Sequence, residues 1–192
     1  MERLEISDYS WLDMGQLSED IELDFNQLWD IHPQEKGIVK IYGKTLEIPR
    51  WQESYIKPYF FSGMYHGGGK LPKILEKLLV WVNNLGYGEF NQVMLNWYKN
   101  GNHYIGAHSD EESQLEKNSS IVSISLGQER KFRVRDKEDS DIILDIDLPD
   151  RRVIVMGGSF QKELTHEIVK VNGKKGQSLS CRINITFRKF KE

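Results

Sequence analysis

The sequence predicts an α+β fold that is mainly β, a sandwich or barrel with two helices packed outside it. Beyond Phe90, short runs of alternating apolar and polar residues follow one another, separated by turn residues. Before Phe90, two segments instead place their apolar residues at helical spacing. A chain of 192 residues suits one domain with an N-terminal extension.

The elements are expected in this order. Residues 17–29 form an amphipathic helix, with apolar residues on one stripe from Leu17 to Trp29. Residues 38–48 alternate about a glycine-containing turn and form a hairpin. A second helix covers 71–85, with Pro72 near its start and Gly86 just past its end. The predicted strands are 91–98, 119–127, 131–135, 141–148, 152–157, 166–171 and 181–190.

Charge is distributed unevenly along the chain. The net charge is −3, but residues 1–40 hold ten Asp and Glu against three Lys and Arg. Five basic residues lie within 128–137, and seven lie within 170–191, which contains no acidic residue. A solvated surface explains such clusters, and so does a phosphate-contacting surface if a functional site lies beside them.

Composition and the chain ends indicate the compartment. The sequence MERLEISDYSW carries charges where a signal peptide needs an apolar stretch, and the most apolar segment, KILEKLLVWV, is short and charged. The single cysteine, Cys181, excludes an internal disulfide framework and a cysteine-cluster metal site. We expect an intracellular protein without a membrane partner, in the nucleus or cytoplasm depending on the host.

The spacing His108-Ser109-Asp110, with His166 much later, predicts a metal site. On an extended segment, residues i and i+2 project to the same side, so His108 and Asp110 can reach one metal ion together. Two histidines and one carboxylate on one face of an octahedron leave three open positions, which suits non-haem Fe(II). A zinc hydrolase would use the same ligand types, and His-x-Asp alone also occurs by chance.

The C-terminal strand indicates an anion site. Period two places Arg182, Asn184, Thr186 and Arg188 on one face of CRINITFRK, opposite an apolar row. Two arginine forks could hold a dicarboxylate, although an edge strand with a solvated basic face would show the same pattern. Asn96 and Tyr98 likewise share one face of a strand just upstream of His108.

These motifs together resemble a known family. The stretch NWYKNGNHYIGAHSDEE, then ISLGQERKFRVR, then His166 and RINITFR are similar to the AlkB family of Fe(II)- and 2-oxoglutarate-dependent nucleic-acid dioxygenases. The resemblance runs from about residue 41 to 190. IYGK, PRWQESY and YFFSG also match, in order, the branch that contains the human duplex-DNA repair homologue.

The resemblance implies a double-stranded β-helix, or jelly roll, with an N-terminal hairpin and flanking helices. Residues 1–40 would be an acidic extension with a covering helix, and 41–192 the dioxygenase domain. Within that domain, nucleotide-recognition hairpins would occupy about 41–70 and the jelly-roll core about 90–190. The iron ligands would be His108, Asp110 and His166. Binding of 2-oxoglutarate would fall to Arg182 and Arg188 at its two ends, with Asn96, Tyr98 and Asn184 completing the cradle.

The resemblance also implies the reaction. With Fe(II), 2-oxoglutarate and O2, such an enzyme hydroxylates an N-methyl carbon on a damaged base of DNA or RNA, and the product collapses to formaldehyde and the repaired base, with succinate released. The cofactor carries the difficult chemistry, and the protein orients the reactants and excludes water. We expect a monomer acting on alkylated nucleic acid.

Substrate residues follow from the same resemblance. Phe61 matches the position that stacks on a flipped base, and Tyr59 one that touches the base edge. Glu111 and Glu112 match acidic positions near the exocyclic amine, which favours cationic lesions such as 1-methyladenine or 3-methylcytosine. Without the family, two glutamates in a polar loop would be read as solvent-exposed.

Nucleic-acid strand contacts are implied at the N-terminal hairpin and at the basic clusters. Tyr42 lies where the duplex-acting relative carries an aromatic wedge, and Arg50 would lie near the same strand. The basic segment 130–137 and four C-terminal lysines become candidate phosphate contacts: Lys174, Lys175, Lys189 and Lys191.

Two other functional classes stay open at this point. One is a dioxygenase of the same fold that acts on a protein or a small molecule. The other is a catalytically silent or zinc-loaded barrel that binds nucleic acid.

Overall fold

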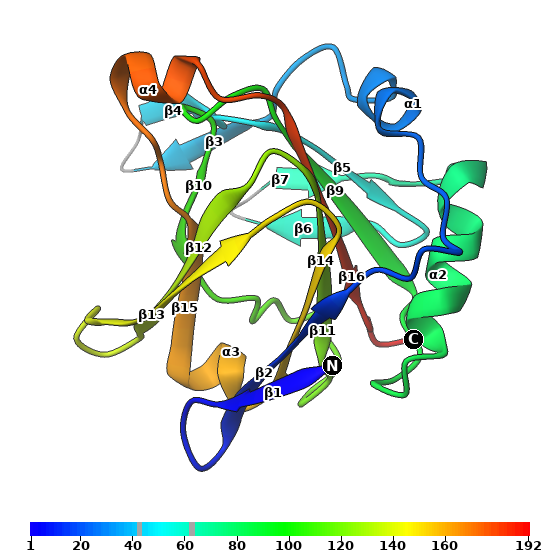
Figure 1. Cartoon of the computed structure of the whole chain (residues 1–192), viewed down its shortest axis with the longest axis vertical. Helices are drawn as coiled ribbons and strands as arrows, with labels where there is room; N and C mark the ends of the chain where they lie inside the picture. Colours follow the sequence, from blue (N-terminus) through cyan, green and yellow to red (C-terminus); the bar gives the residue numbers. More distant parts are fainter. Residues whose placement is uncertain (42–43, 62–63) are drawn as a thin grey trace.

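The computed structural model describes residues 1–41, 44–61 and 64–192, with all their side chains except those of residues 40, 41, 44, 61, 64 and 66 (Figure 1). Two sheets, antiparallel except for one parallel strand pair at an edge of the larger sheet, make up most of the molecule. The structure therefore confirms the mainly β prediction and the jelly roll that the family resemblance implied.

The larger sheet has eight strands, and its central members supply the buried centre of the molecule. Its order is β1 (Glu2–Glu5), β2 (Ser10–Gln16), β14 (Arg152–Gly158), β11 (Ile121–Gly127), β16 (Arg182–Arg188), β9 (Gln92–Tyr98), β5 (Trp51–Tyr55) and β8 (Gly68–Gly69). Every residue of β9 and β16 is buried. Both faces of these two strands are therefore covered.

The smaller sheet has four strands and carries two of the candidate metal ligands. Its order is β10 (Ile105–His108), β15 (Leu164–Ile168), β12 (Arg130–Asp136) and β13 (Ile142–Leu148). Two hairpins lie outside both sheets: β3 (Ile38–Ile41) with β4 (Lys44–Glu47), and β6 (Tyr59–Phe61) with β7 (Met64–His66). The first of them confirms the hairpin predicted over residues 38–48.

The large sheet separates two apolar cores. On its outer face, Ile183, Ile185 and Phe187 of β16 pack into a cluster that also buries Leu28 and Leu78 from the helices. The helices on this side are α1 (Phe25–Asp30), η1 (Lys73–Leu75) and α2 (Glu76–Asn83), and Figure 1 shows α1 and α2 together beside the sheet. None of the described helices is long and apolar enough to cross a bilayer.

The second core lies between the two sheets. Phe132 and Val134 of β12 pack there with Ile154 and Met156 of β14 and with Phe160. Phe160 begins α3 (Phe160–Glu163), a single turn between β14 and β15, while α4 (Gly173–Gln177) precedes β16. The polar face of β16 looks toward this inter-sheet space, so the period-two pattern correctly separated its apolar and polar rows.

The helix predicted over residues 17–29 is wrong in its first half. The helix α1 begins only at Phe25, where the Asp24 side chain accepts the backbone N–H groups of Asn26 and Gln27. Upstream, the Arg151 guanidinium binds the carbonyl oxygens of Ser18 and Ile21, which a continuous helix would use for its own bonds.

The acidic N-terminus also contributes more than a covering helix. Strand β2 pairs with β14 over seven residue pairs, and β1 pairs with β2. The sequence analysis expected no strand there. The pairing gives β14 a hydrogen-bonded neighbour on a side where it would otherwise be an open edge.

Gly158, at the end of β14, shows how closely this N-terminal segment packs. Its φ is +67°, and a Cβ there would lie 2.0 Å from the carbonyl oxygen of Tyr9. Gly86 has a similar φ of +84° but no atom within 4 Å of its Cβ position. Replacing each glycine by alanine therefore separates two losses of stability, one from a positive φ alone and one from a positive φ together with a steric clash.

We expect Gly86→Ala to lower the free energy of unfolding by about 1 kcal/mol, from the positive φ alone. Gly158→Ala should lower it by about 3 kcal/mol, because the added methyl group also collides with Tyr9. Urea denaturation of both variants measures the difference. Equal losses would contradict the proposed packing of the N-terminal segment against Gly158.

Candidate active site

Three side chains form the centre of the site. Strand β10 ends at His108, which lies directly opposite His166 of β15, with ring centroids 4.3 Å apart. Asp110 follows two residues after His108, and its carboxylate lies close to both imidazole rings. One donor atom from each of the three residues lies within 4.8 Å of the others. The predicted convergence of these residues is confirmed, and they could hold a metal ion.

Neighbouring groups fix which atoms of the triad face the centre. The Nδ1 of His108 hydrogen-bonds the Gly106 carbonyl oxygen at 2.9 Å, so its Nε2 is left for a metal and lies 3.8 Å from Asp110 Oδ1. Arg188 donates from Nε and Nη2 to the other oxygen, Asp110 Oδ2, at 3.2 and 3.0 Å. Asp110 Oδ1 and His166 Nδ1 are buried without a hydrogen-bond partner among the described residues.

The protonation states of the triad suit metal binding. Burial and the nearby His108 lower the pKa of His166 to about 3, and burial lowers the pKa of His108. Burial would raise the pKa of Asp110, but the charges of Arg188 and the two histidines outweigh it and lower that pKa to about 2. At neutral pH both imidazoles are neutral and the carboxylate is ionised, as metal ligands must be.

Arg182, close to the triad, is a buried arginine with incomplete hydrogen bonding within the described part of the chain. Its side chain is fully buried, and its Nη2 donates to Ser125 Oγ and Asn184 Oδ1, each at 2.8 Å. Its Nε and Nη1 have no partner, and no carboxylate forms an ion pair with it, among the described residues. Burial lowers the pKa of Arg182 to about 10, so the group is still charged at neutral pH. A buried cation without a counter-ion is costly unless a ligand supplies the anion.

A small cavity joins the triad to the neighbours of Arg182. His108, Asp110 and His166 line it on one side, and Asn96, Tyr98 and Asn184 are among its other lining residues. The guanidinium of Arg182 lies over the Tyr98 ring at 4.9 Å and is bonded to Asn184. The structure thus brings Asn96, Tyr98, Asn184 and Arg188 to the cavity that the triad lines, and Arg182 contacts two of them, Tyr98 and Asn184.

Residues 50–188 match the family model of the 2OG-Fe(II) oxygenase superfamily. The chain belongs to this superfamily. Membership decides between iron and zinc, which the ligand types leave open, and implies Fe(II), 2-oxoglutarate and O2. The triad and the unpaired Arg182 fit these groups.

Among known proteins, the chain of this oxygenase is 32% identical to the human "DNA oxidative demethylase ALKBH2" over 164 residues, which is 79% of this chain and 60% of that protein. The Arabidopsis thaliana protein of the same name is 24% identical over 86% of this chain and 63% of its own length. The human "Alpha-ketoglutarate-dependent dioxygenase alkB homolog 3" is 31% identical over 52% of this chain and 36% of its own length. The chain therefore spans about 60% of the length of the human ALKBH2 protein that it matches.

A solved structure, "The structure of OsALKBH1", superimposes with a TM-score of 0.61 at 18% identity, covering 93% of this chain and 97% of that one. At this identity the likeness establishes the fold alone. It supports the jelly-roll architecture described above.

Arg188, which was expected to bind 2-oxoglutarate, is already paired with the carboxylate of Asp110. Besides the ion pair with Asp110, its Nη1 lies 3.4 Å from Gln92 Oε1. Burial lowers the pKa of Arg188, but the negative charge of Asp110 raises it by more, so the pKa is raised overall. In the oxygenase Arg188 therefore holds the metal ligand in place, while its contact with 2-oxoglutarate stays a prediction.

His108 and Asp110 also line a second cavity. Arg50, Tyr59 and Asn96 help to line it. Arg50 was expected to lie against a nucleic-acid strand, but the structure buries it, with Nε donating to Asn96 Oδ1 at 2.7 Å. This expectation of an accessible strand contact is corrected: Arg50 bridges the two cavities through Asn96.

The two glutamates after Asp110 have different environments. Glu112 is partly buried and accepts the Tyr59 hydroxyl at 2.5 Å, and burial together with the nearby Asp110 charge raises its pKa. Glu111 is exposed and forms an ion pair with Lys137. Of the two glutamates, only Glu112 is therefore bonded to a residue of the second cavity, Tyr59.

Tyr42 and Phe61 are the two remaining residues predicted to contact the substrate. Tyr42 lies outside the described residues. The backbone of Phe61 belongs to β6, but its side chain lies outside the description. Both roles stay predictions.

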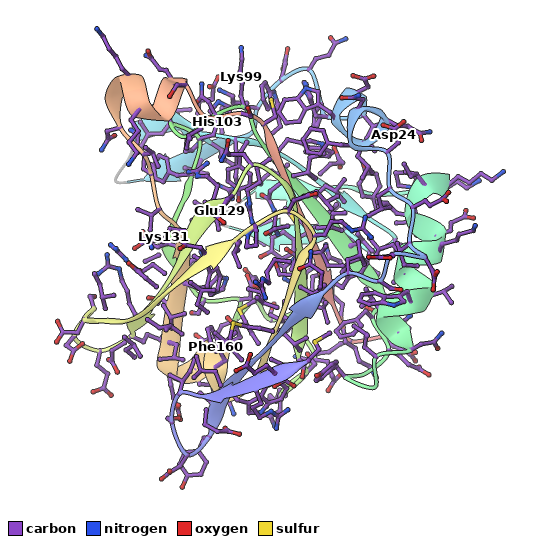
Figure 2. The ribbon with its side chains drawn as sticks, in the orientation of Figure 1. Asp24, Lys99, His103, Glu129, Lys131 and Phe160 are labelled. Atoms are coloured by element: carbon purple, nitrogen blue, oxygen red, sulfur yellow. The ribbon has the colours of Figure 1, made fainter. Side chains whose placement is uncertain are left out.

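The basic segment 130–137 does not offer free cations for phosphate. Its four outer basic residues pair with carboxylates, as Arg133 does with Asp145 and Arg135 with Glu167; Lys131, labelled in Figure 2, pairs with Asp147. Arg130 is buried and donates to four backbone carbonyl oxygens. A phosphate would have to compete with these ion pairs, and the phosphate-contacting role of this segment stays a prediction. In α4, by contrast, Lys174 and Lys175 are exposed.

Sequence patterns missed two residues that support the site. Gln161 of α3 accepts the backbone N–H of Asp110 at 2.9 Å, and Ser125 holds Arg182. Neither has a spacing that indicates a ligand. For Ser125, only its place on the face of β11 that pairs with Asn184 could have given a signal.

We expect Arg182→Met to weaken 2-oxoglutarate binding about tenfold to hundredfold, because the ligand loses a charged hydrogen-bond partner. Without 2-oxoglutarate, the free energy of unfolding should change by less than about 1 kcal/mol, since the lost hydrogen bonds are offset by removing an unpaired buried charge. Calorimetric titration and urea denaturation measure the two effects.

Arg130→Met is the matched control, since this arginine is also buried but both of its terminal nitrogens donate to carbonyl oxygens. It should lower stability and leave the 2-oxoglutarate affinity much less changed than Arg182→Met. Unchanged affinity in the Arg182 variant would place the cosubstrate elsewhere.

Proposed function

We propose that this oxygenase is a 2-oxoglutarate-dependent non-haem iron dioxygenase that demethylates alkylated bases of the 1-methyladenine and 3-methylcytosine type in DNA. The observation that carries the proposal is the triad of His108, Asp110 and His166, which lines a cavity next to the cation Arg182, while His108 and Asp110 also line a second cavity. The two named ALKBH2 relatives are described as DNA oxidative demethylases, which supports DNA as the first substrate to test.

The residues of the chain would divide the work as follows. His108, Asp110 and His166 would hold Fe(II), and Arg188 would keep Asp110 ionised and oriented. Arg182 would bind a carboxylate of 2-oxoglutarate, with Tyr98, Asn96 and Asn184 shaping the cradle. When bound, Fe(II) with O2 couples the oxidative decarboxylation of 2-oxoglutarate to hydroxylation of the N-methyl carbon, which leaves as formaldehyde.

Apolar side chains of the inter-sheet cavity would help to exclude water from this chemistry. Ile105, Phe132, Met156 and Ile168 contribute to its lining. A dry site strengthens the electrostatic interactions of the triad and protects the reaction from competing hydrolysis.

Base selection would fall to the second cavity. Tyr59 lines it, and its hydroxyl is held by Glu112, a carboxylate that favours a cationic methylated base over a neutral one. The target base must leave the stack to reach a buried metal, so a single strand or a flipped nucleotide is required. An aromatic wedge at Tyr42 would favour duplex DNA.

The proposal is tested with oligonucleotides that carry one 1-methyladenine or 3-methylcytosine, as DNA and RNA, single-stranded and duplex. The expected result is formaldehyde and succinate in equal amounts, with the repaired base, dependent on Fe(II) and 2-oxoglutarate and abolished by His166→Ala. Succinate formation without repair of any methylated oligonucleotide would overturn the nucleic-acid assignment and favour a protein or small-molecule substrate. Absence of succinate formation under all conditions would overturn the enzyme assignment.

We expect Glu112→Gln to slow demethylation of 1-methyladenine about tenfold or more, because a charged hydrogen-bond partner near the cationic base is lost. Glu111→Gln is the matched control and should change the rate less than threefold, since Glu111 is exposed and paired with Lys137. Single-turnover rates on one oligonucleotide compare the two variants. Equal effects would contradict the separate placement of the two glutamates.

A further inference from the structure

The single turn α3 contacts the loop that carries Asp110. Gln161 lies in the middle of this turn, and its Oε1 accepts the backbone N–H of Asp110 at 2.9 Å. Its Nε2 lies 3.5 Å from the sulfur of Met156. Because a backbone N–H can only donate, the amide oxygen must be the atom that faces Asp110.

We propose that Gln161 is a positioning residue that fixes the metal ligand Asp110 relative to His166. The inference rests on the metal site of the proposed function, and adds a residue that belongs to neither the triad nor the arginine pair. Gln161 lies five residues before His166, on the turn that leads directly into β15. One short segment therefore carries one ligand and holds the backbone of another.

The loop after β10 gives Asp110 little other support. Asp110 belongs to no helix or strand of the described chain, whereas His108 and His166 are held by strand pairing. Its backbone is bound by Gln161 and its Oδ2 by Arg188. With the backbone N–H and Oδ2 of Asp110 held in this way, Oδ1 lies 3.8 Å from His108 Nε2.

The turn α3 is itself firmly anchored, which a positioning element requires. The Ser159 N–H donates to the Tyr9 carbonyl oxygen at 2.7 Å. The hydroxyl groups of Ser7 and Ser10 donate to Glu163 Oε2 at 2.7 and 2.5 Å. The acidic N-terminal segment, whose purpose the sequence did not indicate, thereby holds α3 at both of its ends.

Metal affinity distinguishes a positioning role from a purely structural one. We would measure binding of Mn²⁺ alone to the full chain, following free Mn²⁺ by electron paramagnetic resonance, and the free energy of unfolding without metal. Gln161→Met keeps the length of the side chain but removes the acceptor, whereas Gln161→Glu keeps an acceptor oxygen. Gln161→Asn, which is too short to reach Asp110, is a second variant in case the methionine variant does not fold.

The expected result is a Kd for Mn²⁺ raised about tenfold to hundredfold in Gln161→Met and Gln161→Asn, as for other groups that orient a metal ligand. Gln161→Glu should lie within about threefold of the wild type. Gln114→Met is the matched control: Gln114 lies in the same loop, but its amide holds the Phe60 N–H and the Pro58 carbonyl oxygen. Its Kd for Mn²⁺ should be unchanged.

An unchanged Kd in both acceptor-deleted variants would overturn the proposal. An equal rise in Gln161→Glu or in Gln114→Met would also overturn it, since the effect would not then depend on the acceptor at Asp110. Mn²⁺ binding requires neither 2-oxoglutarate nor nucleic acid, so a wrong substrate assignment would leave these results unchanged. Failure of the wild type to bind Mn²⁺ would instead contradict the metal site itself, and with it this inference.

Discussion

The ion pair between Arg188 and Asp110 is the interaction on which the site depends. Both side chains are buried, Arg188 on the large sheet and Asp110 on the loop that leaves the small one, so the pair ties the two sheets together at the metal site. Two buried charges are stable only when they compensate each other. Arg188 binds one carboxylate oxygen of Asp110 and leaves the other for a metal. This single contact therefore determines the position of Asp110, its ionised state and the oxygen with which it can bind a metal.

Strand β16 can bury its polar row because the side chains of that row are hydrogen-bonded to one another and to neighbouring strands. Its apolar row seals the sheet against α1 and α2, and the polar row is satisfied internally, with Asn184 bonded to Ser123, Thr186 and Arg182. In this network the Nε and Nη1 of Arg182 lack a partner within the described chain. The fold thus satisfies most of this polar interior and leaves two nitrogens of the Arg182 guanidinium for an anionic ligand to bind.

The sequence allowed the pair His108 and Asp110 and the polar row to be predicted because alternation along extended backbone is a local rule, whereas His166 was assigned through the family resemblance. His108 and Asp110 are two residues apart, and Arg182 to Arg188 follow period two, so their faces were predictable without knowing the fold. The N-terminal strands and the shortened α1 were not, since they depend on distant partners: β14 for β2, and Arg151 for the carbonyl groups of Ser18 and Ile21. The ion pairs of the basic segment were not predictable for the same reason, because their carboxylates lie on β13, on β15 and in the loop after β10.

The most direct test of the central claim is a crystal structure of the wild-type chain with Mn²⁺ and 2-oxoglutarate. The account predicts Mn²⁺ bound by His108, His166 and Asp110 Oδ1, with Arg188 still on Oδ2 and one carboxylate of 2-oxoglutarate on Arg182. A structure in which 2-oxoglutarate binds with both carboxylates away from Arg182, or in which Asp110 has turned from the metal, would contradict it.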